Sequence, residues 1–411
     1  MNFIYNLIIH ITWFHLKIVA LFHPKIKLFV QGRRQTYSIL NNKIRKENKL
    51  IWVHTASLGE FEQGLPIIER LKSTYPNYQL LVTFFSPSGY EVKKNSDVAD
   101  AVVYLPLDTR KNAKRFLEMV NPSLAIFVKY EIWPNYLKEL KEKQVPVLLI
   151  SAMFRKEQVF FKWYGGIMRK ALGTFTHFFV QDNTSVALLE GIKLTNTTIS
   201  GDTRFDRVAE ILERNNKLSF MESFKGNKIC FVAGSTWPED EELIVKFINE
   251  TQKQLKFVLA PHNIKAEHIQ SLKKSIAKKV LLYSEIGKND TSSCQVIIIN
   301  TVGLLTKIYS YADIAYVGGA FATGLHNTLE PAVFGIPILI GPKYKGFNEA
   351  EKLVAKKGIL VTTNYDEFTA SLDALLDNPD HIKNTGTINS NFVKENIGAS
   401  VQIMEHIRRL L

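Results

Sequence analysis

The stretch IAYVGGAFATGLHNTLEPAVFGIPILIGP, residues 314–342, decides the predicted fold. It reads as a short apolar strand (Ile314–Val317), a glycine break, a polar loop, a helix from Leu329 and a second strand from Pro337 to Ile340. Glycines let a ligand approach the backbone, and the amides and dipole of a helix N-terminus favour phosphate or carboxylate. The pattern predicts an anion site in an α/β domain, although an ordinary well-capped helix also fits it.

The start of this helix carries a further candidate ligand. Asn327 or Thr328 stands where an N-cap is expected, and Pro331 fits the first helical positions, where no amide donor is needed. Glu330 in the first turn is either a dipole partner or an acceptor for two hydrogen bonds from a ribose diol.

Length and composition exclude several classes of protein. A chain of 411 residues exceeds one usual core, and 46% hydrophobic with 22% charged residues excludes disorder, so two globular domains are expected. The net charge of +13 predicts an acidic partner: nucleic acid, an anionic membrane surface or a phosphorylated substrate. No nucleic-acid-binding module is recognisable, so no nucleic-acid partner is predicted. Cys230 and Cys294 lie in apolar runs and indicate a reducing compartment.

Residues 1–34 form a hydrophobic and basic segment that we assign to a membrane-associated helix. Phe3 to Phe22 is nearly all apolar, but Asn6, His10 and Lys17 share one helical face. A lysine near the bilayer centre costs about 2.5–3.5 kcal/mol, so a helix lying in the interface is favoured over a spanning anchor or a buried helix. Its aromatic residues would lie near the head groups and its cations would face anionic lipid: Trp13, Phe14, Lys17, Lys25, Lys27, Arg33 and Arg34.

Short apolar strands alternate with helices along the rest of the chain. This alternation predicts α/β architecture with parallel sheets covered on both faces, in two doubly wound, Rossmann-like domains that face a cleft. The series restarts after a polar stretch, so we place the domains at 35–206 and 207–411, and the last helix could pack back on the first domain. In such folds the ligand loops lie at the carboxyl ends of the strands.

In the first domain, polar loops follow three predicted strands. Ser57, Gly59 and Glu60 follow the first strand, and Gly59 permits an unusual backbone angle before Glu60 opens a helix. A carboxylate there could act as a base or only complement the helix dipole. Ser86 follows the second strand, and Glu131 follows the fourth. A structural and a functional role fit Glu131 equally well.

In the second domain, comparable loops predict a nucleotide site. Ser235 and Thr236 follow one strand, Pro261 and His262 follow the next, and a helix is expected from Thr301. The sequence contains no DxD or HExxH motif, no clustered His or Cys, no Walker or dinucleotide glycine motif and no GxSxG. No metal and no cofactor are therefore predicted.

Five motifs together resemble one family. SLGE at 57–60, YEIWPN at 130–135, GDTRFD at 201–206, GST at 234–236 and the 318–342 block are similar to landmarks of 3-deoxy-D-manno-octulosonic acid (Kdo) transferases of lipopolysaccharide biosynthesis. The resemblance implies a GT-B fold, CMP-Kdo as donor, a lipid A precursor as acceptor, and inversion without a metal. It also implies a place on the cytoplasmic face of the inner membrane.

The resemblance also implies residue roles. Glu60 would be the general base, while Ser57, Gly59, Ser86 and Glu131 would lie near the acceptor and the sugars. The donor would be held by Ser235, Thr236, Pro261, His262, Val302, Gly303, Leu304, Asn327, Thr328, Leu329 and Glu330. Two positions depart from the family pattern, since His262 replaces an arginine and Leu304 replaces an acidic residue.

Two other functions fit the same residues. One is another GT-B enzyme, either a UDP-sugar lipid glycosyltransferase or an epimerase. The other is a membrane-surface nucleotide sensor without catalysis.

Overall fold

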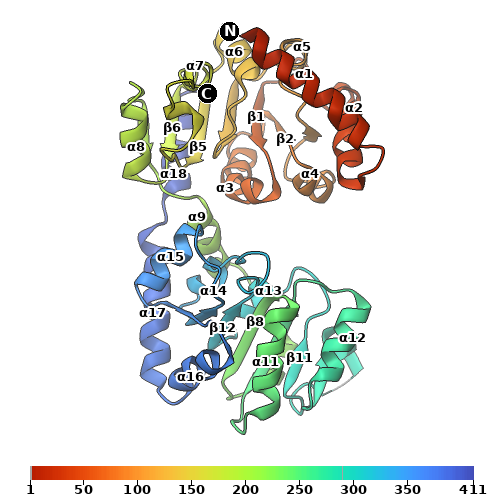
Figure 1. Ribbon diagram of the computed structural model, residues 1–411, viewed down its shortest axis with the longest axis vertical. Helices are drawn as coiled ribbons and strands as arrows, with labels where there is room; N and C mark the ends of the chain where they lie inside the picture. Colours follow the sequence, from red (N-terminus) through yellow and green to blue (C-terminus); the bar gives the residue numbers. More distant parts are fainter. Residues whose placement is uncertain (1, 289) are drawn as a thin grey trace. The chain divides into compact units, whose positions relative to one another are not determined.

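A computed structural model describes residues 2–288 and 290–411 of the chain (Figure 1). It divides into two compact units. Unit 1 comprises Met1–Arg207 together with Ile397–Leu411, and unit 2 comprises Val208–Asn396.

Each unit is built on a parallel sheet of seven strands. The order is β3-β2-β1-β4-β5-β6-β7 in unit 1 and β10-β11-β9-β8-β12-β13-β14 in unit 2. The unit 1 strands are β1 Leu50–Thr55, β2 Gln79–Phe84, β3 Ala101–Tyr104, β4 Leu124–Val128, β5 Val147–Ala152, β6 His177–Val180 and β7 Thr197–Ile199. The unit 2 strands are β8 Cys230–Thr236, β9 Lys256–Pro261, β10 Val280–Leu282, β11 Val296–Ile298, β12 Ile314–Val317, β13 Ile338–Ile340 and β14 Ile359–Val361.

Helices connect the strands in both units. Unit 1 contains α1 Asn2–Val19, α2 Pro24–Lys43, α3 Leu58–Thr74, α4 Pro87–Lys93, α5 Arg110–Val120, α6 Pro134–Glu142, α7 Gly166–Leu172, α8 Asn183–Glu190 and α18 Ala399–Arg408. Helix α9, Arg204–Ala209, crosses the boundary between the units. Unit 2 contains α10 Ser219–Lys225, α11 Pro238–Glu250, α12 Ala266–Ser275, α13 Leu305–Tyr309, α14 Leu329–Val333, α15 Asn348–Ala355, α16 Tyr365–Leu376 and α17 Pro379–Glu395. Short 3-10 turns lie at Val159–Phe161, Glu210–Glu213 and Tyr283–Lys288.

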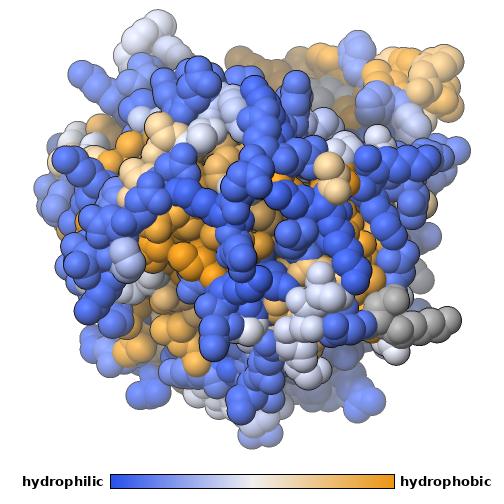
Figure 2. All heavy atoms as spheres, turned by 90° about the horizontal axis from the view of Figure 1, so that it is seen from below, coloured by the Kyte–Doolittle hydropathy of each residue, from blue (hydrophilic) through white to orange (hydrophobic). Residues whose placement is uncertain are grey.

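The sheet of unit 1 is covered on both faces, as the sequence predicted. Along β1, Leu50 and Trp52 belong to one apolar cluster, while Ile51 and Val53 belong to another. Successive side chains of a strand point to opposite faces, so each face has its own core. Charged and polar groups cover most of the surface in Figure 2, with apolar side chains showing between them. The α/β, doubly wound fold class is confirmed.

The N-terminal segment forms two helices instead of one. Helix α1 ends at Val19, and α2 begins at Pro24, a residue that fits the first helical positions. Ile9, Trp13 and Leu16 pack against Phe29 and Val30, so Trp13 faces α2 and not open solvent. The opposite side of α1 exposes large apolar residues, among them Phe3 at 77% and Phe14 at 63%. Within residues 2–288 and 290–411, the structure contains no helix with the length and hydropathy needed to cross a bilayer.

Helix α18 completes the core of unit 1. Ile403, Met404 and Ile407 join the apolar cluster that contains β4 and β5 residues, and Figure 1 shows α18 beside β5 and β6. The buried carboxylate of Asp206 accepts hydrogen bonds from the backbone nitrogens of Gly398 (2.6 Å) and Ser400 (2.9 Å). The GDTRFD motif thus caps a helix almost two hundred residues further along the chain.

Asp206→Ala should lower the free energy of unfolding by about 1–2 kcal/mol, because the first amides of α18 lose their acceptor. Urea unfolding followed by circular dichroism measures this. Ser400→Ala, which removes one hydroxyl from the same carboxylate (3.0 Å), should cost less. An Asp206→Ala midpoint equal to that of the unmodified protein would contradict the capping role.

Candidate active site

Unit 1 places two carboxylates beside its topological switch point. The strand order reverses between β1 and β4, which pair in parallel. Glu60 opens α3 directly after β1, and Glu131 follows β4. Ligands of open α/β sheets bind where neighbouring loops diverge at such a point. Two of the sequence-predicted residues therefore flank the expected binding crevice of this sheet.

Glu60 is held in a state suited to proton transfer. Its Oε2 accepts a hydrogen bond from the backbone nitrogen of Ala56. Burial, followed by the charge of Glu131, raises the pKa of Glu60 to about 7, against opposing effects of the Ala56 amide and Lys129. A carboxyl group with this pKa can accept a proton near neutral pH and is a stronger base than an ordinary glutamate.

Glu131 is fixed by a buried chain of hydrogen bonds that the sequence did not reveal. His54 on β1 is fully buried, and its Nε2 lies 3.1 Å from Glu131 Oε2. Its Nδ1 lies 2.8 Å from Thr83 Oγ1, which also accepts from Trp52 Nε1 at 2.8 Å. Trp133 Nε1 donates to the same Glu131 oxygen at 2.9 Å.

One arrangement of hydrogens satisfies every donor in this chain. If the Thr83 hydroxyl donates to His54 Nδ1, then Nε2 carries the imidazole hydrogen and donates to Glu131. Trp133 Nε1 also lies 3.0 Å from His54 Nε2, but the carboxylate oxygen is the better acceptor for its hydrogen. His54 therefore orients Glu131.

The remaining unit 1 predictions have mixed outcomes. Ser57 is the N-cap of α3, and Ser86 caps α4 by accepting from the backbone nitrogen of Ser88. The Ser86 nitrogen donates to the Ala56 carbonyl at 2.6 Å, which joins the two loops. The unusual backbone angle expected at Gly59 is absent, because Gly59 lies inside α3 and is not among the residues with positive φ. Its place near the acceptor stays a prediction. Its lack of a side chain leaves this turn exposed beside Glu60.

Unit 2 repeats the arrangement with a glycine loop. Its strand order reverses between β8 and β12, so Ser235 and Thr236 lie at one side of the switch point and the 318–327 loop at the other. Gly318 has no room for a side chain, because a Cβ would lie 2.5 Å from the Ser235 carbonyl oxygen. Gly319 has a φ of +95°, which favours glycine. The two glycines thus let the loop backbone pass close to the end of β8, while the predicted approach of a ligand to this backbone stays a prediction.

A buried aspartate ties the two sides of this loop together. Asp240 accepts hydrogen bonds from the Gly319 nitrogen (2.8 Å), the Trp237 nitrogen (2.9 Å) and the Tyr316 hydroxyl (2.7 Å). Burial raises the pKa of Asp240, while these donors lower it. The sequence showed only an acidic helix start, so this structural role was not predicted.

Three rings form a stack in unit 2. Trp237 stacks on His262 with ring centroids 4.9 Å apart, and His262 lies 4.8 Å from His326. Trp237 Nε1 donates to His326 Nε2 at 3.1 Å. The sequence indicated His262 but not the other two rings, since Trp237 is the N-cap of α11 and His326 lies in the glycine loop. The stack offers flat ring faces and imidazole nitrogens to a ligand.

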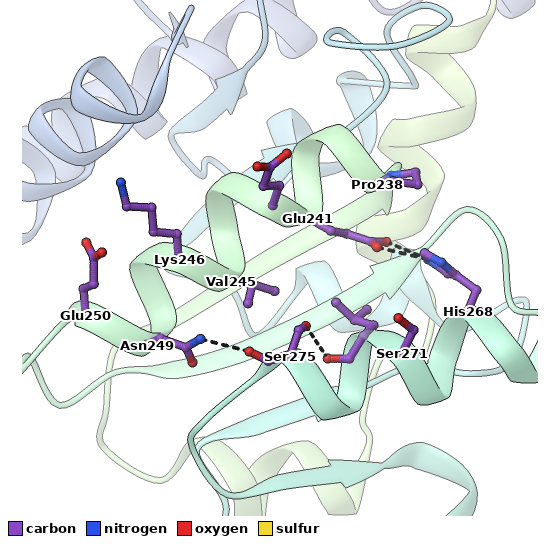
Figure 3. Close-up of a pocket in the computed structure, with 11 residues that line it drawn as sticks. Pro238, Glu241, Val245, Lys246, Asn249, Glu250, His268, Ser271 and Ser275 are labelled. Carbon is purple, nitrogen blue, oxygen red and sulfur yellow. Dashed lines mark hydrogen bonds and ion pairs between the residues drawn. The ribbon is translucent and has the colours of Figure 1, made fainter.

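Thr236 is oriented by the buried Glu241, which pairs with the half-buried His268. Its hydroxyl donates to Glu241 Oε1 at 2.9 Å, and Glu241 Oε2 lies 3.0 Å from His268 Nε2. Figure 3 shows Glu241 on α11 and His268 on α12 pointing toward each other at one end of a groove of about 600 Å³ between the two helices. Burial raises the pKa of Glu241, and His268 opposes the rise.

The helix that the opening stretch predicted is only one turn long. Thr328 is the N-cap of α14 but makes no side-chain cap, and Asn327 Oδ1 accepts from the Leu329 nitrogen instead. A helix of five residues has little dipole, so anion binding here depends on individual amides and side chains. Helix α13 also begins at Leu305 and not at Thr301, because residues 301–303 form a bend.

The other donor-site residues differ in exposure. Thr328, Leu329 and Pro261 are buried, so a ligand could meet only their backbone. Val302 is 80% exposed, Gly303 is exposed and Leu304 is half-buried. Glu330 accepts from Thr306 Oγ1 (3.0 Å) and Asn327 Nδ2 (3.1 Å), one bond on each oxygen.

Comparisons with known proteins identify the family that the chain resembles. A family model described as 3-deoxy-D-manno-octulosonic-acid transferase (kdotransferase) matches residues 31–207. The 3-deoxy-D-manno-octulosonic acid transferase of Aquifex aeolicus is 29% identical over 341 residues, 81% of this chain and 88% of that protein. The chain is a relative of the Kdo transferases. The Haemophilus influenzae transferase is 26% identical, with 96% of this chain and 94% of that protein covered.

Another of the relatives is longer than this chain. A bifunctional glycosyltransferase/methyltransferase of Fusobacterium nucleatum is 26% identical over 384 residues, which cover 90% of this chain. The chain spans 58% of the length of that protein.

Solved structures support the fold. The UDP-GlcNAc 2-epimerase from Neisseria meningitidis matches with a TM-score of 0.61, covering 88% of this chain and 100% of that one at 17% identity. At this identity the likeness concerns the fold alone, and the predicted GT-B fold is confirmed.

Thr83→Val should disturb the carboxylate that Thr83 supports indirectly. Nitrogen-15 NMR of the imidazoles should find His54 of the unmodified protein with its hydrogen on Nε2, and the variant should lose that preference. The buried Trp52 donor also loses its acceptor, at a cost of about 1–3 kcal/mol in unfolding free energy.

Thr55→Val is the matched control, because Thr55 is equally buried at the end of β1 and its hydroxyl donates to the Thr83 carbonyl at 3.5 Å instead of to His54. A hydrogen on Nδ1 in the unmodified protein would contradict the proposed direction of the chain.

Proposed function

We propose that this protein is an inverting, metal-independent glycosyltransferase that moves Kdo from CMP-Kdo to a lipid A precursor. The observation that carries this proposal is Glu60 beside the unit 1 switch point, with a pKa of about 7, in a relative of the Kdo transferases. Unit 1 would supply the base, and unit 2 the nucleotide site.

In the proposed reaction Glu60 accepts the proton of the acceptor hydroxyl. The hydroxyl oxygen forms a bond to the anomeric carbon of Kdo, while the bond from that carbon to the phosphate oxygen breaks. The electron pair leaves with cytidine monophosphate, and the configuration inverts. Glu131 would orient the sugars, and its charge keeps Glu60 a sufficiently strong base.

The proposed donor site uses the loops around the unit 2 switch point. Glu330 could bind the ribose diol through its two carboxylate oxygens, which the hydrogen bonds from Thr306 and Asn327 hold in place beside the glycine loop. The Thr236 hydroxyl donates to Glu241 and so offers the nucleotide phosphate an acceptor only, which makes the Ser235 hydroxyl and backbone amides the better phosphate donors. His262 would replace the family arginine near the phosphate or the base.

We place the proposed reaction on the cytoplasmic face of the inner membrane. The exposed apolar side of α1 and the net charge of +13 suit an anionic, lipid-borne acceptor. Interfacial binding needs no spanning helix.

Glu60→Gln should reduce kcat for Kdo transfer by about 10²–10⁴, because Gln cannot accept the acceptor proton. In the unmodified enzyme the rate should rise with pH and reach half its maximum near the Glu60 pKa of about 7. Mass spectrometry of the lipid product measures both. The control is Glu62→Gln on the same helix, which should retain activity. Normal transfer by Glu60→Gln would remove Glu60 as the base.

Cytidine monophosphate should stabilise the protein more than uridine monophosphate does. A ligand at about 100 times its Kd adds about 2.7 kcal/mol to the unfolding free energy. Thermal melting with each nucleotide separates the proposal from a UDP-sugar enzyme. Glu330→Gln should weaken the cytidine effect, whereas a larger shift with uridine would favour the alternative.

A further inference from the structure

A cationic hollow in unit 1 lies outside the proposed active site. It measures about 290 Å³ and lies between α1, α2 and the loop that leads into α5. Its lining includes Trp13, Arg33, Arg34, Tyr37 and Lys111, and no acidic side chain belongs to it. A second hollow of about 860 Å³ shares His10, Thr109 and Lys111 with the first, so the two adjoin.

Arg33, which lines the hollow, is buried without an acidic partner among the described residues. Its side chain is only 6% exposed, and no carboxylate of the described residues lies within ion-pair distance of it. Two guanidinium nitrogens donate to the carbonyl oxygens of Phe29 (3.0 Å) and Phe85 (2.7 Å), but Nε has no hydrogen-bond partner in the described part of the chain. Burial lowers the pKa of Arg33 to about 9. A buried charge without a counter-charge is costly, so an anion here would be stabilised.

Tyr37, one turn along the same helix, also carries a buried polar atom without a partner. Its hydroxyl is buried and also has no hydrogen-bond partner among the described residues. The ring is covered by the guanidinium of Arg115, whose Cζ lies 4.0 Å from the ring centroid. Two orphaned donors on one wall, together with the Lys111 and Arg34 charges, match an oxyanion with several acceptor atoms.

The surroundings indicate a lipid as the source of that oxyanion. Phe3, which is 77% exposed, lines the adjoining hollow, and the apolar side of α1 continues from it. The adjoining hollow contains Glu139 and Glu142, and Glu142 pairs with Lys138 at 2.8 Å, so the smaller hollow is the anion site. We propose that the hollow formed by Arg33, Tyr37 and Lys111 binds the phosphate of a lipid head group.

Two lipids could supply the phosphate. One is an anionic glycerophospholipid of the bilayer, which would anchor α1 and α2. The other is a phosphorylated acceptor of the proposed reaction, because a series of side-chain contacts leads from the hollow to Glu131. Arg33 bonds to Phe85, the Phe85 ring lies 4.8 Å from the Trp133 ring, and Trp133 bonds to Glu131.

Binding can be measured without catalysis. The Arg33 Nε–H signal in nitrogen-15 NMR should shift when soluble dihexanoyl phosphatidylglycerol or phosphorylated lipid A precursor is titrated into the full chain. Tyr37→Phe and Lys111→Gln should each weaken binding about tenfold, from the loss of one hydrogen bond to a charged group. Lys25→Gln, which removes an exposed charge of α2 outside the hollow, is the matched control and should change binding less than twofold.

The outcomes distinguish the sources. Binding of phosphatidylglycerol supports a bilayer lipid site, and binding of only the phosphorylated precursor, with none of its dephosphorylated form, supports an acceptor subsite. The proposal is overturned if neither lipid shifts the Arg33 signal, or if Lys25→Gln weakens binding as much as Lys111→Gln does. Neither result depends on Kdo transfer, so this inference can fail while the proposed function stands.

Discussion

Parallel strands place their carboxyl ends at one edge of a sheet, and the strand order decides which loops become neighbours. In unit 1 the order 2-1-4 makes the loops after β1 and β4 diverge, although about seventy residues separate them. In unit 2 the order 9-8-12 does the same for Ser235 and Gly318. Both candidate sites depend on these two reversals, because no helix or loop of either site would otherwise meet its partner.

Buried polar groups then fix the loops at each reversal. Asp240 joins the start of α11 to the glycine loop, and His54 joins β1 to Glu131. In a low-dielectric interior, the free-energy cost of an unpaired polar group exceeds the net gain of forming its hydrogen bond. Buried polar groups therefore keep their partners. These side chains hold neighbouring loops together through hydrogen bonds.

The sequence predicted the sheets well, since runs such as Leu124–Val128 are continuously apolar and bounded by loops. It also selected Glu60, Glu131 and the 318–330 loop, because the motifs that carry the family resemblance contain them. It could not find His54, Trp237 or His326 as site residues. His54 lies 77 residues from Glu131 and Trp237 lies 89 residues from His326, and only the strand order brings each pair together. Gly59 was misread because a glycine before a helix and one inside its first turn look alike in sequence.

The raised pKa of Glu60 makes the stability of the protein depend on pH. Its pKa is about 7 in the folded protein and 4.5 ordinarily, so between these values the folded chain binds more protons than the unfolded chain does. The free energy of unfolding therefore falls as pH rises through this window, and the ionised state that could accept a proton is the less stable one. Burial and the charge of Glu131 both raise the basicity of the Glu60 carboxylate. The same two effects lower the free energy of unfolding when that carboxylate is ionised. A glutamine at position 60 would relieve that destabilisation at pH 8 more than at pH 5, so a gain in stability there would accompany the loss of the base.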